Sequence, residues 1–156
     1  MKKPAAAASW IGVALLFLIS TPLWGGDLLM VRSQLPFPQA QPRLEEEIVA
    51  LGYTLSQARR VDIDLVGVGF TSGTYRAISY GDPEEIKMLS RRYPELTPFL
   101  PLQIVIFAER NESLLVALSP LYLKAFFPQP DLAGIFMRWN RDLQQIMENV
   151  RDAPPE

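Results

Sequence analysis

The fold is decided by residues 102–119, which have the sequence LQIVIFAERNESLLVALS. The first part, 102–108, is almost continuously apolar, a pattern typical of a strand in the middle of a sheet. A short polar connection at 109–112 leads to a second β-prone run at 113–119. Two strands joined so closely predict a β-hairpin, and therefore antiparallel pairing.

Three helices are expected around this hairpin. The first is predicted over 42–51, where apolar residues recur at spacings of four and three and a glycine follows. The second is predicted over 83–92, with Asp82 as its N-cap. The third carries the clearest amphipathic stripe, and we expect it to begin at an Asp131 N-cap and to run to about residue 150.

Further strands are expected at 28–33, 61–65 and 74–80, with a proline-containing extended connection over 34–42. The predicted order of elements is therefore β-α-β-β-α-β-β-α. Helices that interrupt pairs of strands indicate the α+β class, with one mainly antiparallel sheet and helices packed on a face. We expect a single domain over residues 27–151, followed by a flexible tail at 152–156.

The first 26 residues have the pattern of a targeting segment. Lys2 and Lys3 precede an uncharged stretch whose apolar core spans 10–19. This order predicts a cleaved signal peptide or a retained membrane anchor, and the sequence leaves both open. In either case we expect the body of the protein to be exported, and to be periplasmic or anchored to the inner membrane facing the periplasm.

Composition excludes several kinds of chemistry. The chain has no Cys and no His, which excludes disulfides, thiol nucleophiles, imidazole bases and Cys/His metal sites. With 15 basic and 17 acidic residues the net charge is −2, so a generic nucleic-acid binder is not expected. We therefore predict no catalytic residue by motif, no metal site, no cofactor and no nucleic-acid partner.

Four stretches, in order, carry a resemblance to a known family. They are Arg43-Leu44-Glu45-Glu46 through Leu51-Gly52-Tyr53, then Gly69-Phe70 and the strand into Gly81-Asp82-Pro83, then Tyr93-Pro94-Glu95 to Leu100-Pro101-Leu102, and finally Val116 with Ser119-Pro120-Leu121-Tyr122-Leu123. In these stretches the chain resembles the bacterial and archaeal domain-of-unknown-function 302 family, over about residues 28–150.

The resemblance implies a compact α/β sandwich of the TATA-binding-protein-like type, commonly a dimer, without implying DNA binding. This chain departs from the family at Asp82, where an Asn is usual, and at Ser119, where an Asp is usual. Asp and Ser are both good N-caps, so we expect these two positions to cap helices.

The leading functional prediction is a non-enzymatic module that binds a small ligand or supports a membrane-associated partner. The sequence offers one polar-aromatic cluster as a ligand site, consisting of Arg76, Tyr80, Asp82, Tyr93 and Tyr122. A plainer interpretation of Arg76 is that it pairs with a nearby carboxylate, because a partly buried arginine needs a partner.

Two other classes of function stay open. A hydrolase or isomerase that uses carboxylates alone would draw on Asp62, Asp64, Asp82 or Glu109, two of which would have to converge in a cleft. A purely structural protein would act through a homodimer or an assembly. An enclosed pocket would favour a ligand, whereas a flat apolar patch would favour a partner.

Overall fold

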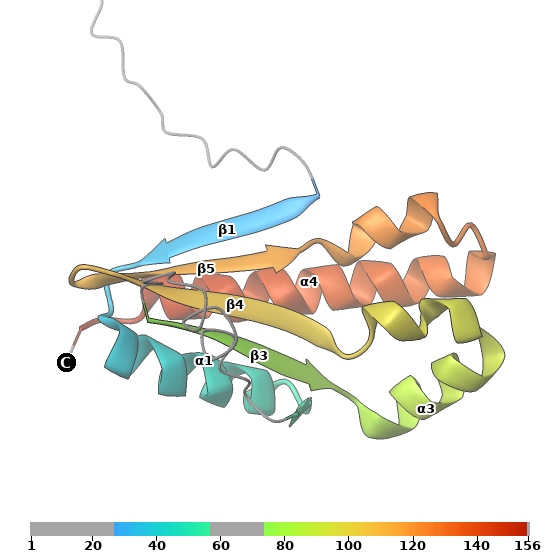
Figure 1. Ribbon diagram of the computed structural model, residues 1–156, viewed down its shortest axis with the longest axis horizontal. Coiled ribbons are helices and arrows are strands. Elements are labelled where there is room, and N and C mark those ends of the chain that lie inside the picture. Colours follow the sequence, from blue (N-terminus) through green and yellow to red (C-terminus); the bar gives the residue numbers. More distant parts are fainter. Residues whose placement is uncertain (1–26, 57–73, 156) are drawn as a thin grey trace, which may run out of the picture.

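The computed structural model describes residues 27–56 and 74–155 (Figure 1). The targeting segment at 1–26 and the predicted strand at 61–65 lie outside the described residues. Within the described ranges, no helix is long and apolar enough to cross a membrane.

The described strands form one five-stranded sheet in the order β1-β5-β4-β3-β2, and every neighbouring pair is antiparallel. Their bounds are β1 Leu28–Ser33, β2 Thr54–Leu55, β3 Tyr75–Gly81, β4 Leu102–Glu109 and β5 Glu112–Leu118. The hairpin prediction is confirmed, because β4 and β5 pair directly from Glu109–Glu112 onward. This hairpin supplies two of the three inner strands of the sheet.

Three α-helices and two short 3-10 helices complete the described chain. They are α1 Phe37–Ala50, α3 Pro83–Arg92, α4 Pro130–Asp152, η1 Pro94–Phe99 and η2 Pro120–Ala125. The α1 and α4 helices lie along one face of the sheet (Figure 1). The predicted α+β class, with one antiparallel sheet and helices packed against it, is confirmed.

The core lies between this helical layer and the inner face of the sheet. Ile104, Ile106 and Leu115 of the hairpin are completely buried, as are Leu44 of α1 and Phe136 of α4. Burying a side chain of this size contributes about 1.5–3 kcal/mol. The alternation of buried residues along β4 and β5 fixes their register, because a slip by one residue would turn the apolar side chains outward.

The start of the first helix was predicted wrongly. α1 begins at Phe37 rather than at residue 42, and it contains Pro42. Prolines were treated as breakers, but Pro38 occupies the first turn, where the missing N–H is harmless. The added turn buries Ala40 and packs Phe37 against the core, which offsets the local cost of Pro42.

The start of the last helix also differs from the prediction. The N-cap of α4 is Gln129, not Asp131, because Pro130 occupies the first helical position. The Asp131 carboxylate instead accepts a hydrogen bond from the Tyr93 hydroxyl. This contact joins the end of α3 to the start of α4.

Candidate ligand site at a split between two strands

The β4–β5 ladder ends before either strand does. Its last pair is Val105–Val116. Beyond that pair, β4 continues beside β3 to Leu102, and β5 continues beside β1 to Leu118. Figure 1 shows the two strands diverging as they leave the hairpin turn. The middle of the sheet is therefore split at this end.

A cavity of about 340 Å³ occupies the split. Its lining comes from both faces of the sheet, from η1 and η2, and from Leu143 of α4. Leu102 and Ala117 contribute from the inner face, whereas Val105 and Val116 contribute from the outer face. None of the described lining residues carries a charge. The cavity can therefore take a small, mainly apolar, neutral molecule.

The sequence opens the sheet here because turns begin where the ladder would continue. Pro101 directly precedes β4, and Pro120 opens η2 two residues after β5. The Ser119 hydroxyl oxygen accepts a hydrogen bond from the Leu121 N–H at 3.3 Å. The same hydroxyl donates to Asn140 Oδ1 at 2.8 Å. Ser119 thereby holds the end of β5 against α4 and away from β4.

Tyr80 lines this cavity from β3. Its side chain is fully buried, and its hydroxyl has no hydrogen-bond partner among the described residues. The neighbouring Tyr53 hydroxyl donates to Asp142 Oδ2 at 2.7 Å. Burial is the main cause that raises the pKa of both tyrosines above the ordinary value. Both phenols are therefore neutral near pH 7.

The other four residues of the predicted site do not line the cavity. Arg76 is half-buried on β3, at the position that pairs with Ile106. Tyr122 packs against Phe126 within η2 and its C-cap, with ring centroids 4.9 Å apart. Whether these side chains bind a ligand stays a prediction.

Asp82 and Ser119 both act as N-caps. The Asp82 carboxylate accepts from the N–H groups of Glu84 and Glu85 at 2.9 and 3.1 Å. Ser119 caps η2 through its bond to Leu121. The prediction that both residues cap helices is confirmed.

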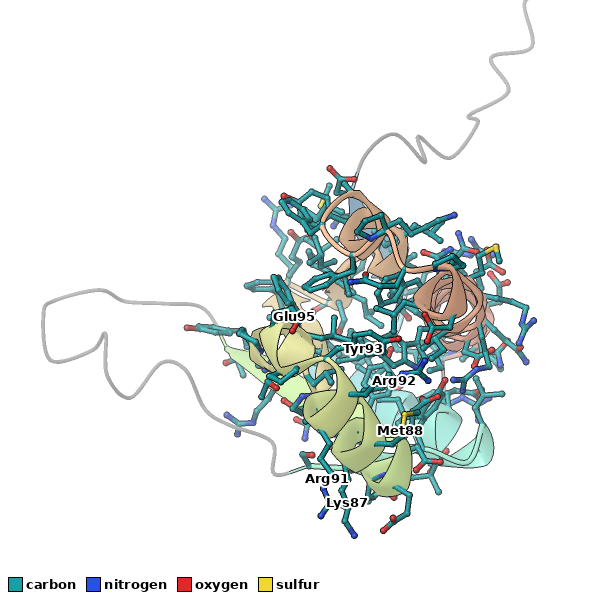
Figure 2. The ribbon with its side chains drawn as sticks, turned by 90° about the vertical axis from the view of Figure 1, so that its right-hand side faces the viewer. Lys87, Met88, Arg91, Arg92, Tyr93 and Glu95 are labelled. Carbon is teal, nitrogen blue, oxygen red and sulfur yellow. The ribbon has the colours of Figure 1, made fainter. Side chains whose placement is uncertain are left out.

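Tyr93 is engaged at the junction of α3 and α4. Figure 2 shows Arg92 and Tyr93 on the side of α3 that faces α4, with Lys87 and Arg91 on the far side. Arg92 Nη2 lies 2.9 Å from the Asp131 carboxylate, which also accepts from Tyr93. The Tyr93 hydrogen bond is the main cause that holds the pKa of Asp131 below its ordinary value.

The two described carboxylates of the hydrolase hypothesis do not converge. Asp82 follows β3 at one end of the sheet, and Glu109 ends β4 at the other. Glu109 forms an ion pair with Arg32, while Asp82 caps α3. Asp62 and Asp64 lie outside the described residues. Among the residues that are described, no cluster of acidic side chains could hold a metal ion.

Sequence reasoning missed most of the cavity lining. Leu102 and Leu118 were predicted at or near the ends of strands, which is also where the structure places them. The available signal was the pair of prolines, Pro101 and Pro120, that bracket the hairpin at the same end. A proline cannot donate to a ladder, so two at one end indicate a sheet that opens there.

The fold and cavity define a class: a helix-backed, five-stranded antiparallel α+β domain with an apolar cavity in a split of its sheet. The chain belongs to the family described as domain of unknown function DUF302, which matches residues 29–150. No curated protein matches it. An uncharacterized conserved DUF302 protein from Bacillus stearothermophilus has a similar crystal structure, with a TM-score of 0.71 and 19% identity, covering 81% of this chain and 100% of that one. At this identity the likeness shows the fold.

Proposed function

We propose that this protein is an exported, non-enzymatic module that binds a small apolar ligand in the cavity of the split sheet. The observation that carries the proposal is the cavity itself, about 340 Å³ and uncharged. Pockets for small molecules commonly have volumes of about 300–1,000 Å³ and mainly apolar walls. Export rests on the sequence of residues 1–26, whose basic start and apolar core are typical of a targeting segment.

The walls of the cavity belong to elements that are already fixed by packing. β4 is held by β3, and β5 is held by β1 and by the bond between Ser119 and Asn140. Leu123 and Leu143, which close the cavity on the helical side, are almost completely buried. A preformed pocket binds without the entropy cost of ordering its walls.

The test is an amide NMR titration of the full-length chain with cycloheptanone, a small neutral apolar probe. We expect saturable shifts that centre on the residues lining the cavity. Ala117→Leu, which adds bulk to the cavity wall, should weaken binding at least about tenfold. Ala50→Leu is the matched control, because Ala50 is exposed at the end of α1 and is not in the lining. Absence of saturable shifts, or unchanged binding by Ala117→Leu, would overturn the proposal.

A second candidate is self-assembly through the outer face of the sheet. Leu28, Met30 and Leu118 on this face are 52%, 63% and 43% exposed. Register places Met30 beside Val116, which continues the apolar surface inward. Exposed apolar surface of this kind favours a partner, and a second copy of this chain would match it with the same chemistry.

Sedimentation velocity on the full-length chain tests this candidate. We expect a dimer for the wild type and a monomer for Met30→Asp. Met137→Asp is the control, since Met137 is 53% exposed on α4, away from the sheet. A monomeric wild type, or equal effects of both substitutions, would contradict self-assembly through this face.

A further inference from the structure

The two strands that frame the cavity present to it main-chain groups that the β4–β5 ladder does not pair. Antiparallel strands alternate between hydrogen-bonded and non-hydrogen-bonded pairs. The two-residue turn between Glu109 and Glu112 makes that pair a hydrogen-bonded one. Counting by two, the bonded pairs are Phe107–Leu114 and Val105–Val116. The next would be Gln103–Leu118, but the ladder has ended there.

Hydrogen bonds from β4 to the β3 side and from β5 to the β1 side independently indicate the same alternation. The Ala108 N–H donates to the Thr74 carbonyl at 2.8 Å, so even-numbered residues of β4 face β3. The Ser119 N–H donates to the Asp27 carbonyl at 2.6 Å, so odd-numbered residues near the end of β5 face β1. The main-chain N–H and C=O of Gln103 and of Leu118 therefore point toward each other across the split.

Both residues line the cavity, and the β4–β5 ladder ends before it pairs them. Each offers one donor and one acceptor on the same edge, at the border of a largely apolar space. Both residues are exposed, so water can pair these groups in the free protein. A ligand that displaces this water replaces both hydrogen bonds when it presents a donor and an acceptor side by side. A hydrocarbon offers neither, and a carboxylate offers acceptors alone.

We infer that the cavity recognises a small neutral amide on an apolar body, such as a lactam or a primary carboxamide. Its N–H and C=O would pair with Gln103 or Leu118 and supply the missing rung of the ladder. The uncharged lining suits a neutral molecule and disfavours an ion, because an unpaired charge is costly to bury. This inference rests on the proposed function, and it adds the chemical class of the ligand.

The experiment compares matched seven-membered rings on the full-length chain by amide NMR titration. The rings are ε-caprolactam, with donor and acceptor, N-methyl-ε-caprolactam, whose donor is blocked, and cycloheptanone, with an acceptor alone. We expect the lactam to bind about tenfold more tightly than either analogue, which corresponds to one or two added hydrogen bonds. The amide proton of Gln103 or of Leu118, whichever residue pairs with the lactam, should shift downfield.

Failure of this inference differs from failure of the proposed function. If all three rings bind equally, and Ala117→Leu weakens all three, the cavity binds apolar ligands but does not recognise amides. If none binds saturably, the proposed function falls as well. A lactam preference that Ala117→Leu leaves intact would place amide recognition elsewhere and would also overturn the inference.

Discussion

The ring of Tyr53 stands edge-on to the ring of Tyr80, with centroids 5.3 Å apart and planes at 77°. The two hydroxyls nevertheless have different surroundings. That of Tyr53 donates to Asp142, whereas that of Tyr80 has no partner among the described residues. Replacing each tyrosine by phenylalanine therefore compares two effects on stability: the loss of a hydrogen bond at Tyr53 and the removal of an unpaired hydroxyl at Tyr80.

Tyr53→Phe should destabilise the protein. The change removes the 2.7 Å bond to Asp142 and leaves that mostly buried carboxylate with one fewer donor. Hydrogen bonds to charged groups contribute about 1.5–3 kcal/mol, and partial exposure favours the lower end. Urea unfolding measures the difference in the free energy of unfolding. A loss below about 0.5 kcal/mol would show that the bond contributes little.

Tyr80→Phe should be neutral or stabilising. It removes a buried hydroxyl that makes no hydrogen bond in the described part of the chain, while the ring that packs against Tyr53 is retained. Relief of the unpaired group is expected to raise the free energy of unfolding by up to about 1 kcal/mol. Urea unfolding beside Tyr53→Phe gives a direct comparison. A clear destabilisation would mean that the hydroxyl does have a partner.

Alkaline pH should destabilise the fold through the same two residues. Burial raises the pKa of Tyr53 and Tyr80, so the folded state holds these protons more tightly than the unfolded state. Their contribution is fully present below the unfolded pKa of about 10, and it is lost as pH rises beyond that value. Among the five tyrosines, these two should ionise only with unfolding. Tyrosinate absorbance followed together with circular dichroism tests this. Separate, earlier ionisation of all five would contradict it.

The hairpin and the helical periodicities were predictable because they depend on neighbouring residues. The two β-prone runs of the hairpin and the stripe of α4 are local patterns, and they match the structure. The start of α1 was missed because the packing of Phe37 and Ala40 outweighs the proline signal. No local pattern contains that contact.

The candidate site was less predictable, because it depends on where a ladder ends. The split depends on two contacts at the end of β5. This strand stays paired with β1 as far as Leu118, and Ser119 bonds to Asn140, a residue that lies 21 positions away. Of the five residues predicted as a ligand site, Tyr80 alone lines the cavity. Asp82 and Tyr93 stand next to turns in the sequence. In the structure Asp82 caps the start of α3, and Tyr93 joins the end of α3 to the start of α4.

Tyr93→Phe should raise the pKa of Asp131 toward its ordinary value. The Tyr93 hydroxyl is the main cause of the lowered pKa, and Arg92 adds to it. A lowered folded pKa stabilises the fold above the unfolded pKa, and this contribution is lost as pH falls through the folded value. Carboxyl-carbon NMR across an acid titration measures the pKa directly. An unchanged pKa of Asp131 would show that Arg92 or the N-terminus of α4, rather than Tyr93, lowers it.

Gly52→Ala and Gly134→Ala should have opposite effects on stability. Gly52 has φ of 86° just after α1, where its N–H and that of Tyr53 bond to the carbonyls of Val49 and Ile48. A Cβ there meets no atom within 4 Å, so the expected loss of about 1 kcal/mol comes from the backbone alone.

Gly134 is the matched position, exposed inside α4 and likewise free of neighbours around an added Cβ. Alanine in a helix interior is favoured over glycine by about 1 kcal/mol, so this variant should be more stable than the wild type. Urea unfolding of the two variants measures both signs. An added Cβ meets no neighbour at either site. A lower free energy of unfolding for Gly134→Ala, or a higher one for Gly52→Ala, would therefore contradict the assigned backbone conformations. A loss of stability at Gly52 together with a gain at Gly134 is the result expected if the left-handed backbone at residue 52 alone causes the difference.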